Sequence, residues 1–187
     1  GRVKGDEKAI LIAQLLAHLL QKEYEKKKLG SEVLHLYQEV NLMFDFSDIL
    51  AKTIGASDIA QKTLDEASRV IQSDNGVIVL WDDQNRQLQV IASTGELFFD
   101  QEKINTELPV LLSIILSGQS EIISGTSRLR TAGIVLPHIR SVLYSALKVN
   151  HRVMGAVILA SNEDIQYTAA DLKLLTTLAL QSSAAIE

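Results

Sequence analysis

The sequence contains no cysteine and only two prolines among its 187 residues. Without cysteine the chain cannot form a disulfide, a cysteine-ligated zinc site, a thiol nucleophile or a thioether to a chromophore. Its hydrophobic fraction of 47% and charged fraction of 22% are typical of a folded domain. At this length, buried apolar surface can hold one core together without a covalent or metal crosslink.

Long apolar runs are also missing. The most apolar stretch is Ala9–Leu20, whose twelve residues include Gln14 and His18, whereas a membrane-spanning helix needs about 20 residues. Lysine and glutamate follow this stretch, where a signal peptide would have small residues at its cleavage site. We therefore expect a cytoplasmic protein that does not act at a membrane.

Positive charge is concentrated near the N-terminus. Residues 1–30 carry seven Lys/Arg against four Asp/Glu, a net +3, while the remaining residues carry 11 against 19, a net −8. The basic cluster Lys22, Lys26, Lys27 and Lys28 is interleaved with glutamates, which is typical of a solvated helix face. The acidic remainder argues against a nucleic-acid partner.

An apolar repeat runs through the first third of the chain. Alternating steps of three and four from Ile12 to Ile54 give thirteen positions, of which ten are apolar and two are Lys22 and Lys26. A 3.5-residue repeat keeps one seam of a helix facing a partner helix. We expect a coiled-coil-like helix over residues 1–39 that forms a homodimer, with packing on its own domain as the alternative. The predicted dimer interface is Ile12, Leu15, Leu19, Leu29, Val33, Leu36, Val40 and Met43.

Residues 40–187 have the pattern of one α+β domain. A helix is expected after Gly55, capped by Ser57 or Asp58. Alternating apolar residues predict one hairpin within residues 77–92 and a second within residues 144–160, the second turning at residues 150–152. Neither hairpin leaves room for a crossover helix, so the sheet is expected to be antiparallel. A final helix is expected from about residue 168.

The segment between the hairpins, residues 96–140, is mixed in character. It predicts a short helix at Pro109–Ser117, a strand at Glu121–Ile123 and a loop or broken helix at Gly125–Leu136. The expected fold is therefore an antiparallel sheet with helices on one face and this insert over the other face.

This order of elements resembles a GAF domain, a small-molecule-sensing module of signalling proteins. The resemblance covers residues 40–187 and is carried by VNLMFDFSDILAKTIGASDIAQKTLDEASRVI, GVIVLWDDQNRQLQVIAS, VMGAVILASNED and YTAADLKLLTTLALQSSAAIE. The upstream helix resembles the leaders of multidomain signalling proteins, especially cyanobacterial ones. The resemblance implies a ligand pocket between sheet and insert, dimerisation through the terminal helices and a downstream output domain outside this sequence.

Candidate ligand-binding residues lie in and beside the insert. Two arginines, Arg128 and Arg130, could hold a carboxylate or phosphate, or they could be ordinary surface residues. Trp81 could wall a pocket or pack in the core. The four histidines are dispersed and lack metal-ligand spacing, so we expect no metal and no cofactor. The candidates for ligand binding are Trp81, Ser93, Thr94, Phe98, Arg128, Arg130, His138 and Tyr144.

The stretch SNEDIQYTAADLKLL partly matches the Asn-Lys, Phe, Asp-Glu signature of cyclic-nucleotide-binding family members. Asn162 and Asp171 match, but Glu163 replaces Lys, Tyr167 replaces Phe and Leu172 replaces Glu. The signature's Lys–Asp ion pair is therefore lost. The same residues predict a helix start, with Thr168 as the N-cap, Asp171 in the first turn, and Tyr167 and Leu172 as a hydrophobic staple.

No catalytic constellation is visible, so the predicted function is that of a non-enzymatic regulatory module. It would dimerise and relay the state of an unidentified small molecule or partner to a kinase, nucleotide cyclase or phosphatase domain. The alternatives are a purely structural relay whose pocket is filled by its own side chains and a cyclic-nucleotide-binding domain.

Overall fold

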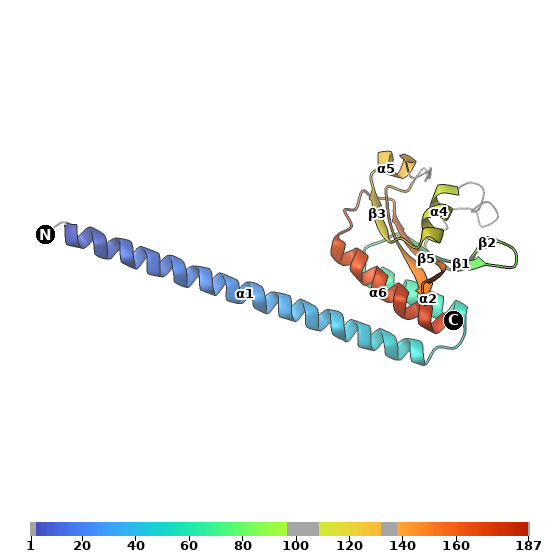
Figure 1. The fold of residues 1–187 in the computed structure, drawn as a ribbon, viewed down its shortest axis with the longest axis horizontal. Helices are drawn as coiled ribbons and strands as arrows, with labels where there is room; N and C mark the ends of the chain where they lie inside the picture. Colours follow the sequence, from blue (N-terminus) through green and yellow to red (C-terminus); the bar gives the residue numbers. More distant parts are fainter. Residues whose placement is uncertain (1–2, 97–108, 132–137, 187) are drawn as a thin grey trace. The chain divides into compact units, whose positions relative to one another are not determined.

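The computed structural model describes residues 3–96, 109–131 and 138–186 (Figure 1). Contacts divide the chain into two compact units, residues 1–45 and residues 46–187. Among the helices of the described ranges, none is both long enough and apolar enough to cross a bilayer.

A single helix, α1, runs from Val3 to Ala51, so the boundary between the units lies inside it. Between Leu11 and Phe44 most of its large apolar side chains are exposed, including Leu20 at 71% and Phe44 at 71%, while Leu42 and Met43 are half-buried. The expected seam does not extend to its last two positions. Leu50 is buried in the globular unit, and Ile54 lies beyond the end of α1.

The globular unit is an α+β fold around a five-stranded antiparallel sheet in the order β2-β1-β5-β4-β3. This confirms the predicted fold class. Helices α2 and α6 cover one face of the sheet, and α4 and α5 lie over the other (Figure 1). The elements are α2 (Ala56–Val70), β1 (Asn75–Asp82), β2 (Gln87–Thr94), α4 (Pro109–Ser117), β3 (Glu121–Ser124), α5 (Thr126–Thr131), β4 (Ser141–Val149), β5 (Arg152–Ser161) and α6 (Ala169–Ile186).

Two expected local details are corrected. The turn between β4 and β5 has two residues, because Asn150 and His151 both have positive φ, at 48° and 68°. That geometry is typical of a tight hairpin turn, so Arg152 belongs to β5. Helix α2 has Gly55 at its N-cap without a side-chain cap, and Ser57 Oγ donates instead to the carbonyl of Ile91 at 3.1 Å.

Helix α6 starts at the predicted N-cap residue, Thr168, whose hydrogen bonds with Asp171 form a capping box. The N–H of Asp171 donates to Thr168 Oγ1 at 3.2 Å, and the N–H of Thr168 donates to Asp171 Oδ2 at 2.7 Å. These reciprocal bonds pair two amide groups that a helix start would otherwise leave without partners.

Helix α6 packs on α2 and on β4 through a face that combines leucines with small residues. Leu175, Leu178 and Ala179 are fully buried there. The hydroxyls of Thr63 on α2 and Ser182 on α6 lie 2.7 Å apart, and both side chains are fully buried. The contact between the two helices therefore has a polar centre inside an apolar core.

Candidate functional site

The side of the sheet that faces α4 and α5 carries three of the eight predicted ligand-binding residues, namely Trp81, Tyr144 and Arg128. Alternate residues of β1, β4 and β5 point to this side because successive side chains of a strand face opposite ways. They form one apolar cluster with Ile115 of α4 and Leu129 of α5, both almost fully buried. Trp81 packs against this cluster. In the described residues this side is thus lined largely by the chain's own apolar side chains.

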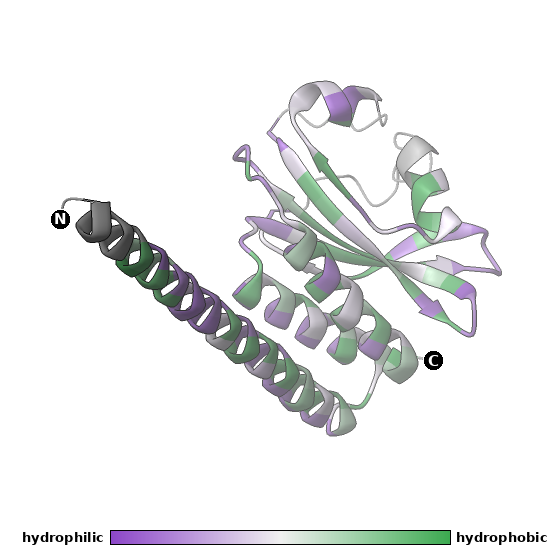
Figure 2. Cartoon of the chain, turned by 60° about the vertical axis from the view of Figure 1, so that its left-hand side comes forward, coloured by the Kyte–Doolittle hydropathy of each residue, from purple (hydrophilic) through white to green (hydrophobic). Residues whose placement is uncertain are grey.

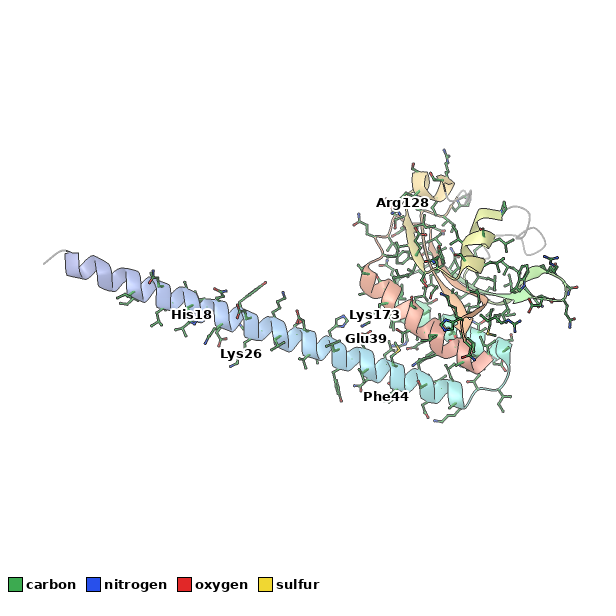
Figure 3. All side chains as sticks on the ribbon, in the orientation of Figure 1. His18, Lys26, Glu39, Phe44, Arg128 and Lys173 are labelled. Carbon is green, nitrogen blue, oxygen red and sulfur yellow. The ribbon has the colours of Figure 1, made fainter. Side chains whose placement is uncertain are left out.

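Two of the candidates, Arg128 and Tyr144, lie together with Glu121 in a polar cluster, here called the polar corner. The hydroxyl of Tyr144 on β4 donates to Glu121 Oε2 on β3 at 3.2 Å. The guanidinium of Arg128 on α5, labelled in Figure 3, lies 3.9 Å from Glu121 Oε1. Burial raises the pKa of the Tyr144 hydroxyl above its usual value, and the charge of Glu121 and its hydrogen bond raise it further. The tyrosine is therefore a neutral hydrogen-bond donor at physiological pH.

Glu121 was not among the predicted site residues, although it links Arg128 to Tyr144. It is the first residue of the short strand β3, and no local sequence pattern indicates this role. The link exists because β3 pairs with β4, which sets Glu121 directly opposite Tyr144.

The other candidates lie apart from this corner. Ser93 and Thr94 are on β2, where they pair with Val77 and Gly76 of β1. Arg130 and His138 are exposed, and within the described ranges no hydrogen bond or ion pair joins them to the corner. Phe98 lies outside the described residues.

The residues that partly match the cyclic-nucleotide signature are engaged in structural hydrogen bonds. Asp74, just before β1, accepts from Ser161 Oγ at 2.6 Å and from the N–H of Asn162 at 2.8 Å. These bonds, first that of Ser161, hold the pKa of Asp74 below its usual value. The side chain of Asn75 donates to Asn162 Oδ1 at 3.4 Å. Asn162 thus links the end of β5 to the start of β1 by hydrogen bonds.

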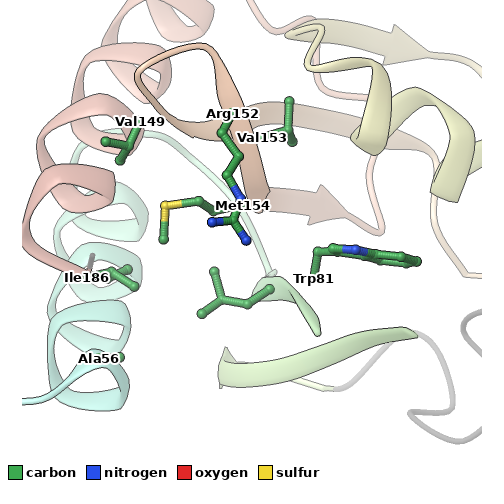
Figure 4. Close-up of a pocket in the computed structure, with 8 residues that line it drawn as sticks. Ala56, Trp81, Val149, Arg152, Val153, Met154 and Ile186 are labelled. Atoms are coloured by element: carbon green, nitrogen blue, oxygen red, sulfur yellow. The ribbon is translucent and has the colours of Figure 1, made fainter. Parts of the chain in front are cut away.

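A separate cavity of about 270 Å³ lies at the opposite end of β1 and β5 (Figure 4). Of the predicted candidates, only Trp81 lines it. Its other walls come from the start of α2, the turn end of the β4–β5 hairpin and the last turn of α6. Strand alternation alone does not predict it, because residues of five separate elements must come together to line it.

The globular unit matches a known family model and resembles several solved structures. A family model described as GAF domain matches residues 56–187. The structure is similar to the GAF domain of an Acinetobacter phosphoenolpyruvate-protein phosphotransferase, with a TM-score of 0.66 and 16% identity over 80% of this chain and 92% of that one.

Two further solved structures have a similar fold. One is a methyl-accepting chemotaxis protein, residues 122 to 287, with a TM-score of 0.62 and 17% identity over 75% of this chain and 94% of that one. The other is free methionine-R-sulfoxide reductase from Neisseria meningitidis in complex with its substrate, with a TM-score of 0.67 and 14% identity over 79% and 87%. No curated protein matches the sequence.

Proposed function

Since the chain belongs to the GAF domain family, we propose that it is a regulatory module that dimerises through α1. It relays the state of a small molecule or a partner protein to an attached output domain, which is a kinase, a nucleotide cyclase or a phosphatase. The chain itself carries out no catalytic step. Modules with this fold in a chemotaxis protein and in a putative two-component sensor histidine kinase support the sensory part of the proposal.

The exposed seam of α1 carries the dimer proposal. Seven of its eight predicted interface side chains have exposed fractions between 49% and 61%, and Met43 is half-buried. A soluble monomer rarely exposes so many large apolar side chains in one line. A second copy of the same helix would cover them with matched spacing.

The seam consists of two apolar blocks. Figure 2 shows apolar residues on both sides of a hydrophilic stretch of α1, which contains Lys22 and Lys26. A charged residue at a seam position weakens a coiled coil but favours one register over others. The blocks Ile12–Leu19 and Leu29–Met43 would therefore supply the affinity, and the lysines would limit the alignments that two copies can adopt.

The test is sedimentation velocity at tens of micromolar with two matched double variants. Leu19→Glu/Val33→Glu places charge in the seam, and Leu20→Glu/Leu34→Glu places the same charge one residue further along the helix. Leu20 and Leu34 are 71% and 57% exposed, so both variants alter exposed leucines or valines of α1. We expect the seam variant to be monomeric and the control to remain dimeric. A monomeric unmodified protein, or equal dissociation of both variants, would refute the dimer proposal.

A purely structural relay is the second candidate, and the packed apolar cluster on the α4 and α5 side favours it. A thermal-shift screen with small molecules, including cyclic AMP and cyclic GMP at millimolar concentration, separates the two. A specific ligand raises the melting temperature by binding the native state. The absence of any shift across the library would support the structural relay.

A further inference from the structure

The cavity at the turn end of the β4–β5 hairpin is formed where two central strands part. Strands β1 and β5 pair from Asn75↔Ala160 as far as Leu80↔Gly155. Beyond that point β1 continues pairing with β2 as far as Asp82, and β5 continues pairing with β4 as far as Arg152. The two strands therefore diverge from each other while each stays in the sheet, and the opening lies between them.

The pairing of β1 with β5 ends at Gly155, where the two backbones lie very close together. A Cβ built on Gly155 would lie 1.9 Å from the carbonyl oxygen of Val79 and 2.9 Å from Cα of Leu80. The two backbones thus approach each other too closely for any side chain. The register between β4 and β5 shifts at Leu147/Lys148, close to this approach, and such irregularities bend a strand locally. The opening is built into the sheet.

The walls of the cavity are mainly apolar. Six half-buried side chains from β1, β4, β5 and α6 line it, namely Leu80, Trp81, Val149, Val153, Met154 and Ile186. Its volume of about 270 Å³ is just below the range of roughly 300–1,000 Å³ of sites for drug-sized ligands. The space is therefore suited to a small molecule with a branched or aromatic apolar group.

A pair of opposite charges stands at this cavity. Arg152 lines it (Figure 4) and forms an ion pair with Asp83, which follows β1. The side chains of Arg152 and Asp83 are 71% and 59% exposed, so water screens the pair and its contribution to stability is small. A ligand can therefore separate the pair at little energetic cost.

We propose that this cavity binds a small apolar α-amino acid, with its side chain between β1 and β5 and its charged groups at the Arg152–Asp83 pair. The ligand carboxylate pairs with the Arg152 guanidinium, which can hold a carboxylate through two parallel hydrogen bonds. The ligand ammonium pairs with the Asp83 carboxylate. Arg152 and Asp83 thus each exchange their original ion-pair partner for an oppositely charged group of the ligand.

Ligands with a single charge fit this arrangement less well. A simple carboxylate would pair with Arg152 but would bring its negative charge next to Asp83. A simple amine would pair with Asp83 and leave Arg152 facing a positive charge. Like charges at close range are unfavourable, so both analogues should bind more weakly than the amino acid.

The cavity also touches the end of α6. Ile186 lies in the last turn of α6, and Lys148, one residue before the wall residue Val149, donates its N–H to Ser183 Oγ of α6 at 2.9 Å. Filling the cavity therefore acts on the last turn of α6 from two sides. This regulatory consequence rests on the proposed relay function, whereas binding itself does not depend on it or on dimerisation.

Trp81 provides the readout, because it is the only tryptophan in the sequence and it lines the cavity. The experiment titrates the full chain with L-leucine, L-methionine and L-phenylalanine and follows tryptophan fluorescence. The one-charge analogues of leucine, 4-methylpentanoate and 3-methylbutylamine, are titrated in parallel. We expect a saturable change with at least one amino acid and at least about tenfold weaker binding of both analogues.

Three exposed variants complete the test. Arg152→Gln and Asp83→Asn should each weaken amino-acid binding by about tenfold or more, because each removes one charged partner. Arg140→Gln, at an exposed arginine just before β4, is the matched control and should bind as the unmodified protein does. The proposal is overturned if no amino acid gives a saturable change up to 20 mM, if either analogue binds as tightly, or if Asp83→Asn binds normally. A failure here leaves the sedimentation result for α1 unaffected, so the two proposals fail separately.

Discussion

The backbone N–H of Lys148 donates a hydrogen bond of 2.9 Å to Oγ of Ser183. Lys148 lies where the register between β4 and β5 shifts, and Ser183 is fully buried on α6. Ser183 Oγ donates its own proton to the carbonyl of Ala179 at 2.7 Å. This one hydroxyl therefore both accepts from the sheet and donates within its helix, and it fixes the last turns of α6 on β4.

Ser183→Ala should destabilise the globular unit by about 1–3 kcal/mol, because the N–H of Lys148 loses its partner in a poorly hydrated position. Urea unfolding followed by far-UV circular dichroism measures the change. Ser113→Ala, at an exposed position of α4, is the control and should change the free energy of unfolding by less than about 0.5 kcal/mol. Equal effects of the two substitutions would contradict the role given to Ser183.

Thr63→Val should lower the free energy of unfolding by less than Ser183→Ala does, because the Thr63 and Ser182 hydroxyls have too few protons for all their contacts. Thr63 donates to the carbonyl of Ile59 at 2.7 Å, Ser182 donates to that of Leu178 at 2.7 Å, and the two hydroxyl oxygens also lie 2.7 Å apart. Two protons thus serve three contacts, and one contact always lacks a proton. Removing one hydroxyl leaves the other fully bonded to its own helix.

We therefore expect Thr63→Val to lower the free energy of unfolding by less than about 1 kcal/mol, since no donor is left without an acceptor. The same urea experiment gives this value. A loss larger than that of Ser183→Ala would show that the Thr63–Ser182 contact is a strong hydrogen bond.

Gly155→Ala should be among the most damaging small substitutions in the globular unit. The added Cβ would overlap the carbonyl oxygen of Val79 at 1.9 Å, and only a backbone shift could relieve this overlap. We expect a loss of about 2 kcal/mol or more, comparable to overpacking a core. Thermal unfolding of the globular unit measures it.

Gly30→Ala is the contrasting substitution. A Cβ at Gly30 meets nothing within 4 Å, and alanine is favoured over glycine in a helix by about 1 kcal/mol. It should raise the helix content of α1 and leave the unfolding of residues 46–187 unchanged. A stable Gly155→Ala protein would refute the close approach of β1 and β5.

Asp74 should make stability depend on acid pH. The Ser161 hydroxyl and then the N–H of Asn162 hold its pKa in the folded protein below the 3.8 of an unperturbed aspartate. The ionised form therefore stabilises the folded state at pH values above about 3.8, and this stabilisation is lost as pH falls through the lower folded pKa. Asp74→Asn should flatten the fall of stability below about pH 4.

Urea midpoints between pH 2.5 and pH 6 measure this effect. Ser161→Ala removes the largest cause of the lowered pKa and should flatten the profile in the same direction. An unchanged pH profile in both variants would show that Asp74 does not contribute to acid unfolding.

Local patterns of the sequence were sufficient for much of the fold. The hairpins follow from apolar alternation, and the start of α6 follows from Thr168 and Asp171, because a capping box involves residues only three apart. The helix at Pro109–Ser117 follows from its proline start and the glycine after its end. The order of these elements predicts an antiparallel sheet with helices on one face, which the structure has, and the family match confirms the resemblance to GAF domains.

The site was less predictable, because its residues are far apart in the sequence. Arg128 and Tyr144 were candidates, but Glu121, which joins them, was not. Ser57 was expected to cap α2, and it instead bonds to Ile91, 34 residues away. Leu50 fits the seam repeat, yet it is buried in the globular unit. No local pattern distinguishes these outcomes.

The sequence by itself thus determined the type, order and ends of most elements, since helix caps, turns and hairpins depend on neighbouring residues. Only the tertiary structure decided which side chains meet. The cavity beside Arg152 lies where β1 and β5, whose backbones are in close contact at Gly155, no longer pair. That geometry is set by the packing of strands that are distant in sequence, because backbone contacts of this kind form only when the whole sheet is assembled.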